Sequence, residues 1–91
     1  MKYIKKFENK DHEIGDYILY RIYYYNNPTD TFAQIYDISK DSFDFFPYKV
    51  QYIDKNKLDK DSCNSTNIVR NLTHDEIEEF KTRIAQIQYN L

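Results

Sequence analysis

The sequence predicts one α+β domain: a small, strongly bent antiparallel sheet of three to five strands, followed by a C-terminal amphipathic helix. The chain has 91 residues, of which 41% are hydrophobic and 18% aromatic, enough for one core and too few for a second. Aromatic and β-branched runs separated by turn residues occupy residues 16–53, and helical spacing of apolar residues occupies 74–88. Residues 1–13 precede them as a lead segment.

Three strands are predicted in the first half of the chain. Gly15 precedes the first, which is dense in isoleucine and tyrosine, and residues 26–30 have turn chemistry that makes a hairpin of the first two. Pro47 interrupts the third strand and indicates an edge or a bend there. The predicted strands are residues 16–25, 32–38 and 43–53.

The second half is predicted to hold a loop, a short strand and the helix. Residues 54–67 alternate lysine and aspartate before a polar cluster, which indicates a solvated loop, and residues 68–70 are long enough for a short closing strand. Thr73 and Glu76 have the spacing of a capping box, which begins a helix. The apolar residues at helical spacing are Ile77, Phe80, Ile84 and Ile87.

Two short stretches resemble known families. Residues 15–19, with the sequence GDYIL, resemble the opening strand of small SH3-like barrels, and residues 32–38 fall where that family continues. The resemblance implies an SH3-like barrel, although Ala33 stands where the family has a glycine. Residues 1–8 and 89–91 look like the ends of small proteins of tailed phages with AT-rich genomes. Such accessory proteins often inhibit a host defence nuclease, which implies an anti-CRISPR-like activity.

The residues that most enzymes need are missing from this sequence. Cys63 is the only cysteine and stands in a polar segment without a nearby histidine, so we expect an incidental thiol. One glycine cannot build a phosphate-binding loop, and His12, His74 and Cys63 lie too far apart in sequence for zinc ligands. We therefore expect a protein that is not an enzyme and holds no cofactor or metal.

Charge and hydropathy limit the cellular setting. The net charge is −2, which argues against a broadly basic nucleic-acid binder. A lone cysteine is typical of a reducing compartment, and no run approaches the roughly 18 apolar residues of a membrane span. We expect a cytoplasmic protein that does not enter a membrane.

The aromatic residues are the positive signal for function. In the first strand, alternation places tyrosines on both faces, so one face has more aromatic area than a small core needs. Either the C-terminal helix covers that face, or it binds a partner. The stretch from Phe43 to Tyr48 likewise suits docking on a protein or filling space under a bend. The residues predicted to contact a protein partner are Tyr23, Tyr25, Asp41, Asp44, Phe45, Phe46 and Tyr48.

The function predicted from these observations is binding and inhibition of a host protein, such as a nucleic-acid-guided nuclease. One alternative is a single-stranded nucleic-acid binder, in which the rings stack on bases and cations contact phosphates. Aspartates interleaved with those cations weaken that alternative. A second alternative is self-association through a sheet edge or the helix, as a homodimer or assembly component. The cations of the nucleic-acid alternative are Arg21, Lys49, Lys55, Lys57, Lys60 and Arg70.

Overall fold

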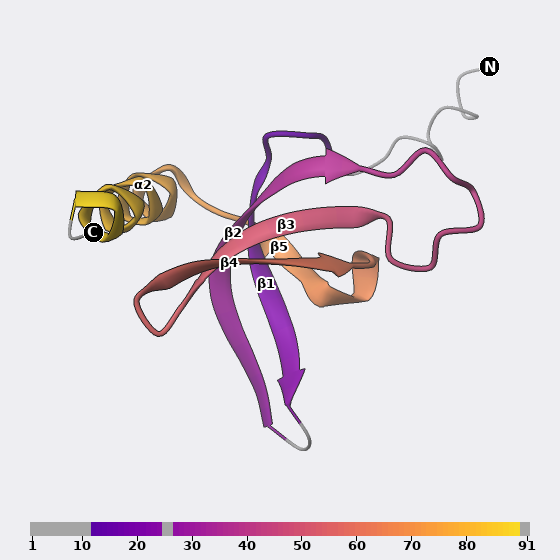
Figure 1. The fold of residues 1–91 in the computed structure, drawn as a ribbon, viewed down its shortest axis with the longest axis horizontal. Coiled ribbons are helices and arrows are strands. Elements are labelled where there is room, and N and C mark those ends of the chain that lie inside the picture. The colour runs from indigo at the N-terminus through magenta and orange to yellow at the C-terminus, as the bar shows by residue number, and fades with distance from the viewer. Residues whose placement is uncertain (1–11, 25–26, 90–91) are drawn as a thin grey trace.

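Five antiparallel strands, a short 3-10 helix and one α-helix form the fold (Figure 1). The structure is a computed structural model that describes residues 12–24 and 27–89. The predicted α+β class and the C-terminal helix are confirmed. The elements are β1 (Tyr17–Tyr24), β2 (Asn27–Ile38), β3 (Tyr48–Asp54), β4 (Lys57–Cys63), the 3-10 helix η1 (Ser65–Asn67), β5 (Ile68–Asn71) and α2 (His74–Tyr89).

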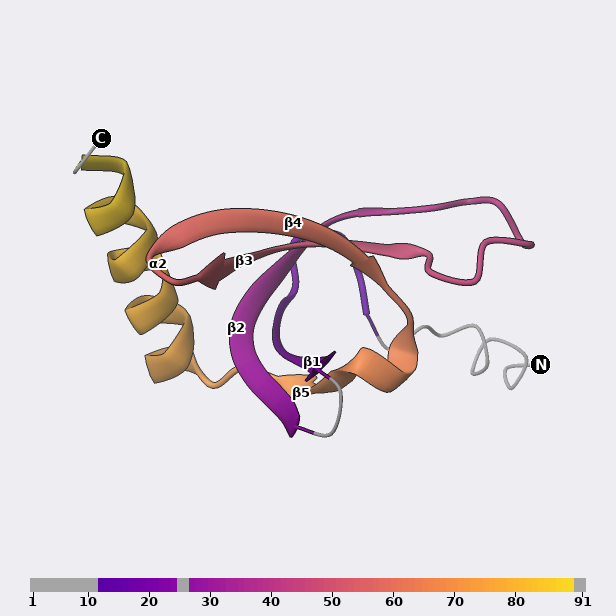
Figure 2. The same cartoon turned by 60° about the horizontal axis from the view of Figure 1, so that its bottom comes forward.

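The strands lie in one sheet in the order β4-β3-β2-β1-β5. Strands β1 to β4 form a meander, and β5 returns to pair with β1 at the far edge. Figure 2 shows how strongly the sheet bends. A β-bulge contributes to the bend, because the register of β2 on β3 shifts between Ile35 and Asp37. The bent sheet is confirmed, but it stays open within the described residues, with β4 and β5 as its two edges.

One face of the sheet carries the hydrophobic core. Residues at every second position of β1 face it, as period-two alternation requires, and Ile22 packs against it less completely. The second alternating set of β1, which includes Tyr17 and Tyr23, points to the opposite face. The buried residues of the core are Ile18, Tyr20, Ala33, Ile35, Val50, Tyr52 and Cys63.

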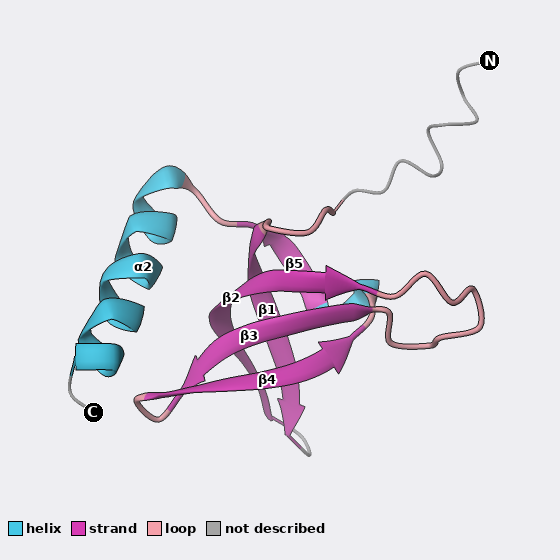
Figure 3. Ribbon diagram, turned by 45° about the horizontal axis from the view of Figure 1, so that its top comes forward, coloured by secondary structure: helices cyan, strands magenta, loops and turns pink. Residues whose placement is uncertain are grey.

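Helix α2 covers part of the opposite face (Figure 3). The predicted capping box is present: the Thr73 amide donates to Glu76 over 2.8 Å, and the Glu76 amide donates to the Thr73 hydroxyl over 3.3 Å. The buried Phe80 ring meets Tyr17 and Phe32 edge-on, with ring centroids 6.0 and 6.3 Å apart. The helix therefore covers the second face of β1 at Tyr17, whereas Tyr23 farther along remains exposed.

Three predicted boundaries are wrong. Residues 54–67 are not a single loop, because they hold β4 and η1. Strand β2 begins at Asn27, inside the predicted turn, since residues 27–31 pair with β1. Residues 43–46 lie outside β3, which begins only after Pro47. Of the predicted lead segment, residues 1–11 lie outside the described part of the chain.

Candidate protein-binding site

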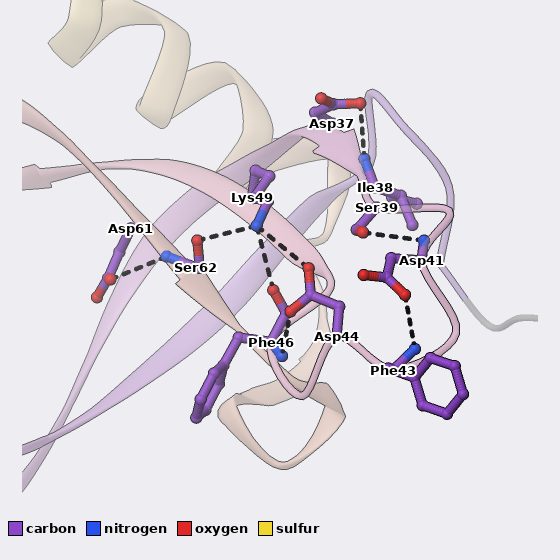
Figure 4. A network of polar contacts seen from close by, with 10 residues as sticks. All are labelled: Asp37, Ile38, Ser39, Asp41, Phe43, Asp44, Phe46, Lys49, Asp61 and Ser62. Carbon is purple, nitrogen blue, oxygen red and sulfur yellow. Dashed lines mark hydrogen bonds and ion pairs between the residues drawn. The ribbon is translucent and has the colours of Figure 1, made fainter.

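Residues 39–47 connect β2 to β3 and form a loop that its own side chains hold in place (Figure 4). We call it the Phe loop. The Ser39 amide donates to the Pro47 carbonyl oxygen over 2.8 Å and closes the base of the loop. The Asp41 carboxylate accepts the Phe43 amide over 2.9 Å. Aspartate favours such turns because its short side chain reaches the amide two residues ahead.

Asp44 and Lys49 fasten the second half of the Phe loop to the sheet. The Asp44 carboxylate accepts the Phe46 amide over 2.9 Å and lies 3.6 Å from Lys49 Nζ. The Phe46 amide, with help from Ser39 and Lys49, holds the pKa of Asp44 below its ordinary value. Lys49 Nζ also donates to the Ser62 hydroxyl of β4 over 3.3 Å. The loop backbone is thus fixed from both ends.

Three phenylalanine rings project from the Phe loop into solvent. The exposed fraction is 85% for Phe43, 81% for Phe45 and 50% for Phe46. Each ring leaves apolar area in water that burial in an interface would remove at about 25 cal/mol per Å². Neighbouring exposed rings on a fixed backbone are typical of docking surfaces, where aromatic anchors carry much of the binding free energy. The alternative prediction, that the stretch from Phe43 to Tyr48 fills space under a bend, is therefore wrong for these three rings.

The predicted contact residues do not form one surface. Tyr48 is half-buried against the core, with its ring edge-on to His12 at 5.8 Å. Tyr23 is 57% exposed on the β1–β2 hairpin, away from the Phe loop (Figures 1 and 3). Tyr25 lies outside the described residues. The members that the fold brings together in the Phe loop are Asp41, Asp44, Phe45 and Phe46.

Phe43 is the residue that the predicted set omits, although it is the most exposed ring of the loop. The sequence could have indicated Phe43, because it belongs to the same aromatic stretch and follows Asp41 by two residues. The two aspartates also have a role inside the loop. Their carboxylates accept amides of the loop itself, so they position the rings.

The cations of the nucleic-acid alternative are mostly engaged. Three of the six lie in ion pairs, so a phosphate would compete with a carboxylate at each of them. Lys60 Nζ lies 5.1 Å from the centre of the Tyr36 ring, while Lys55 in the β3–β4 turn and Lys57 next to it are exposed. These six residues, all in the described part of the chain, form no row of free cations beside exposed rings. The ion pairs are Arg21–Asp30 at 2.7 Å, Lys49–Asp44 at 3.6 Å and Arg70–Glu76 at 2.7 Å.

The described residues offer little for covalent or metal chemistry. Cys63 is buried, and burial raises the pKa of its thiol to about 12, so almost no thiolate forms at neutral pH. Within residues 12–24 and 27–89, no three histidine, cysteine or acidic side chains lie close enough to hold a metal ion. In the same ranges, no helix is long and apolar enough to cross a membrane.

Comparison of the chain with protein-family models, with curated proteins and with solved structures finds no match.

Proposed function

We propose that this protein is a non-enzymatic binding module that docks on another protein through the Phe loop. The observation that carries the proposal is the exposure of three phenylalanine rings on a loop whose backbone two aspartates hold. A fixed loop loses little conformational entropy on binding, so most of the free energy gained by burying the rings is kept as affinity.

The proposed partner is a host defence effector, such as a nucleic-acid-guided nuclease, which the protein inhibits in the host cytoplasm. This part of the proposal is supported by the resemblance of the chain ends to phage proteins. The buried Cys63 thiol and the engaged carboxylates of the Phe loop fit a role in binding rather than in catalysis.

The test compares three tagged chains in a nuclease-treated host lysate: the natural chain, Phe43→Ser with Phe45→Ser, and Tyr89→Ser. Tyr89 is 86% exposed at the end of α2, so its substitution removes a similar exposed ring elsewhere. We expect the natural chain and Tyr89→Ser to retain the same protein. Loss of one hot-spot ring weakens binding by on the order of 2 kcal/mol, or about 30-fold.

Calorimetric titration of that protein, together with thermal unfolding of each variant, completes the test. Equal affinity of the natural chain and the double Phe variant would contradict the proposal. A loss of binding that accompanies a loss of folding would remove its support, because the rings would then be structural. Recovery of nucleic acid that nuclease treatment abolishes would favour the stacking alternative instead.

A further inference from the structure

A cleft between α2 and the β3–β4 turn is a second surface that the fold leaves open. Phe80 is the buried residue of α2, and Ile87 near the end of the helix is only half-buried. Figure 3 shows the last turns of α2 beside the β3–β4 turn. The cleft has a volume of about 740 Å³, within the range of roughly 300–1,000 Å³ typical of ligand sites. Its lining residues are Asn56, Lys57, Leu58, Arg83, Gln86, Ile87 and Gln88.

The lining of the cleft combines two aliphatic side chains with positive charge. Leu58 and Ile87 supply half-buried aliphatic side chains, while Lys57 and Arg83 add two cations, and no carboxylate lines the cleft. Neither cation has an ion-pair partner among the described residues. A complementary occupant must therefore present apolar side chains together with a carboxylate.

The Phe loop has this chemistry. Residues 39–47 contain three phenylalanines and two aspartates against one basic residue, Lys40, so the loop carries a net negative charge. The Asp41 Oδ1 atom accepts the Phe43 amide, and no hydrogen bond within the described ranges uses its Oδ2 atom. One carboxylate oxygen thus remains able to meet a lysine or an arginine beside the exposed rings.

The Phe loop lies at one end of the molecule in all three ribbon views (Figures 1, 2 and 3), and the two elements that line the cleft, α2 and the β3–β4 turn, lie at the other end. Because α2 and the β3–β4 turn lie apart from the loop in every view, the Phe loop does not reach the cleft of its own chain. We propose that the Phe loop of one copy docks in the α2 cleft of a second copy. One contact then removes two exposed apolar surfaces from water.

This proposal rests on the proposed function in one respect, since both require the Phe loop to be a protein-docking element. It adds a partner, another copy of this chain, and a receiving surface. The contact joins two different surfaces, so each copy can insert its own Phe loop into one neighbour and bind the Phe loop of another in its α2 cleft.

The experiment is sedimentation of the full chain and of two complementary variants. The loop variant carries Phe43→Ser and Phe45→Ser, and the cleft variant carries Lys57→Glu and Arg83→Glu. We expect the natural chain to exceed its monomer mass of 11.2 kDa as concentration rises. Each variant alone should remain monomeric, because reversing two cations beside a carboxylate or removing two rings weakens the contact by about tenfold or more.

Mixing the two variants is the decisive step. The loop variant keeps an intact cleft and the cleft variant keeps an intact Phe loop, so we expect the equimolar mixture to form a one-to-one pair. Misfolded variants could not regain association in this way. Tyr23→Ser serves as the control, since its exposed ring lies on neither surface, and it should associate like the natural chain.

Three outcomes would overturn the proposal: a natural chain that stays monomeric at millimolar concentration, assembly that the loop variant retains, or variants that remain monomeric when mixed. A monomeric natural chain whose Phe loop still captures a foreign protein would remove self-docking and leave the proposed function standing. Self-association that needs both surfaces, without loop-dependent capture of a host protein, would support self-docking and contradict the proposed function.

Discussion

The Tyr20 hydroxyl donates a hydrogen bond to the Asp61 carboxylate over 2.8 Å and joins β1 to β4 across the core face. Two strands separate β1 from β4 in the sheet, so this bond can form only because the sheet curls and brings them face to face. The Tyr20 ring also packs against Tyr52, with centroids 5.2 Å apart. Burial, together with Asp61, raises the pKa of the Tyr20 phenol, which therefore stays protonated and able to donate.

Tyr20→Phe removes this bond while keeping the ring. We expect the free energy of unfolding to fall by about 1 kcal/mol, the usual net value of a hydrogen bond. Urea unfolding of the natural chain, Tyr20→Phe, Asp61→Ala and the double variant would measure the coupling between the two side chains. Additive effects of the two single substitutions would show that the bond contributes nothing.

Asp44 is predicted to hold the shape of the Phe loop. Asp44→Ala removes the acceptor of the Phe46 amide, so we expect that amide to exchange its hydrogen faster, as NMR measures, while core amides keep their protection. Asp59→Ala is a suitable control, because Asp59 accepts the amide of Lys60, far from the loop. An unchanged exchange rate at Phe46 would mean that the remaining contacts suffice.

Low pH should loosen the same loop. The folded pKa of Asp44 lies below its ordinary value of 3.8, so its stabilising effect is complete above that value. The effect is lost as pH falls through the lower folded pKa and the carboxylate takes up a proton. Weaker protection of the Phe46 amide, measured relative to an unstructured amide at the same pH, is therefore expected only below about pH 4, and Asp44→Ala should abolish the pH dependence of that protection.

Much of the fold could be predicted from local patterns. Alternation in the first strand places Ile18 and Tyr20 on one face because a buried sheet face imposes period two. The helix could be predicted because Thr73 and Glu76 satisfy amides at its beginning. Phe80 also belongs to a set of apolar residues at helical spacing. Both signals depend on residues close together in sequence.

Strand β4 could not be predicted from such patterns, because it is an edge strand with little to bury. Cys63 is its buried residue, and its other positions are mostly charged, as edge strands that avoid aggregation often are. The predicted contact residues lie on separate surfaces for a similar reason. Tyr23 and Tyr48 look alike in sequence, and only the path of the sheet leaves Tyr23 exposed and packs Tyr48 against the core.

The same substitution at Phe80 and at Phe43 should change stability by very different amounts. Phe80 is fully buried against Tyr17 and Phe32, so we expect Phe80→Ala to lower the free energy of unfolding by about 3–5 kcal/mol. Phe43 is exposed, so we expect Phe43→Ala to change it by about 0.5 kcal/mol or less. Urea unfolding checks both values. Similar losses for the two variants would mean that the Phe loop is structural.

Glu76 should make stability depend on pH at the beginning of α2. The hydrogen bond from Arg70, followed by that from the Thr73 amide, lowers the pKa of Glu76 from 4.5 to about 2. Its contribution is thus complete above pH 4.5 and is lost as pH falls from 4.5 toward 2. We expect the difference in unfolding free energy between the natural chain and Glu76→Gln to shrink over that window. A difference that is constant with pH would contradict the assignment.

The β3–β4 turn offers a stabilising substitution. Asp54 pairs with Lys57, so two residues form the turn, and both have positive φ: 52° for Lys55 and 64° for Asn56. Two positive values define the type I′ turn, which favours Asn-Gly because side chains other than asparagine and aspartate are strained there. We expect Lys55→Asn with Asn56→Gly to raise the free energy of unfolding by about 1 kcal/mol.

Asn56→Ala is the opposing control for this turn, since alanine gains nothing from the left-handed conformation and should lower the free energy of unfolding. Both variants are compared with the natural chain by urea unfolding, at a concentration low enough that self-association does not add to stability. Equal stability of all three chains would mean that the turn relaxes out of positive φ at little cost. β4 would then be held by its pairing with β3 and by the Tyr20–Asp61 bond rather than by the turn.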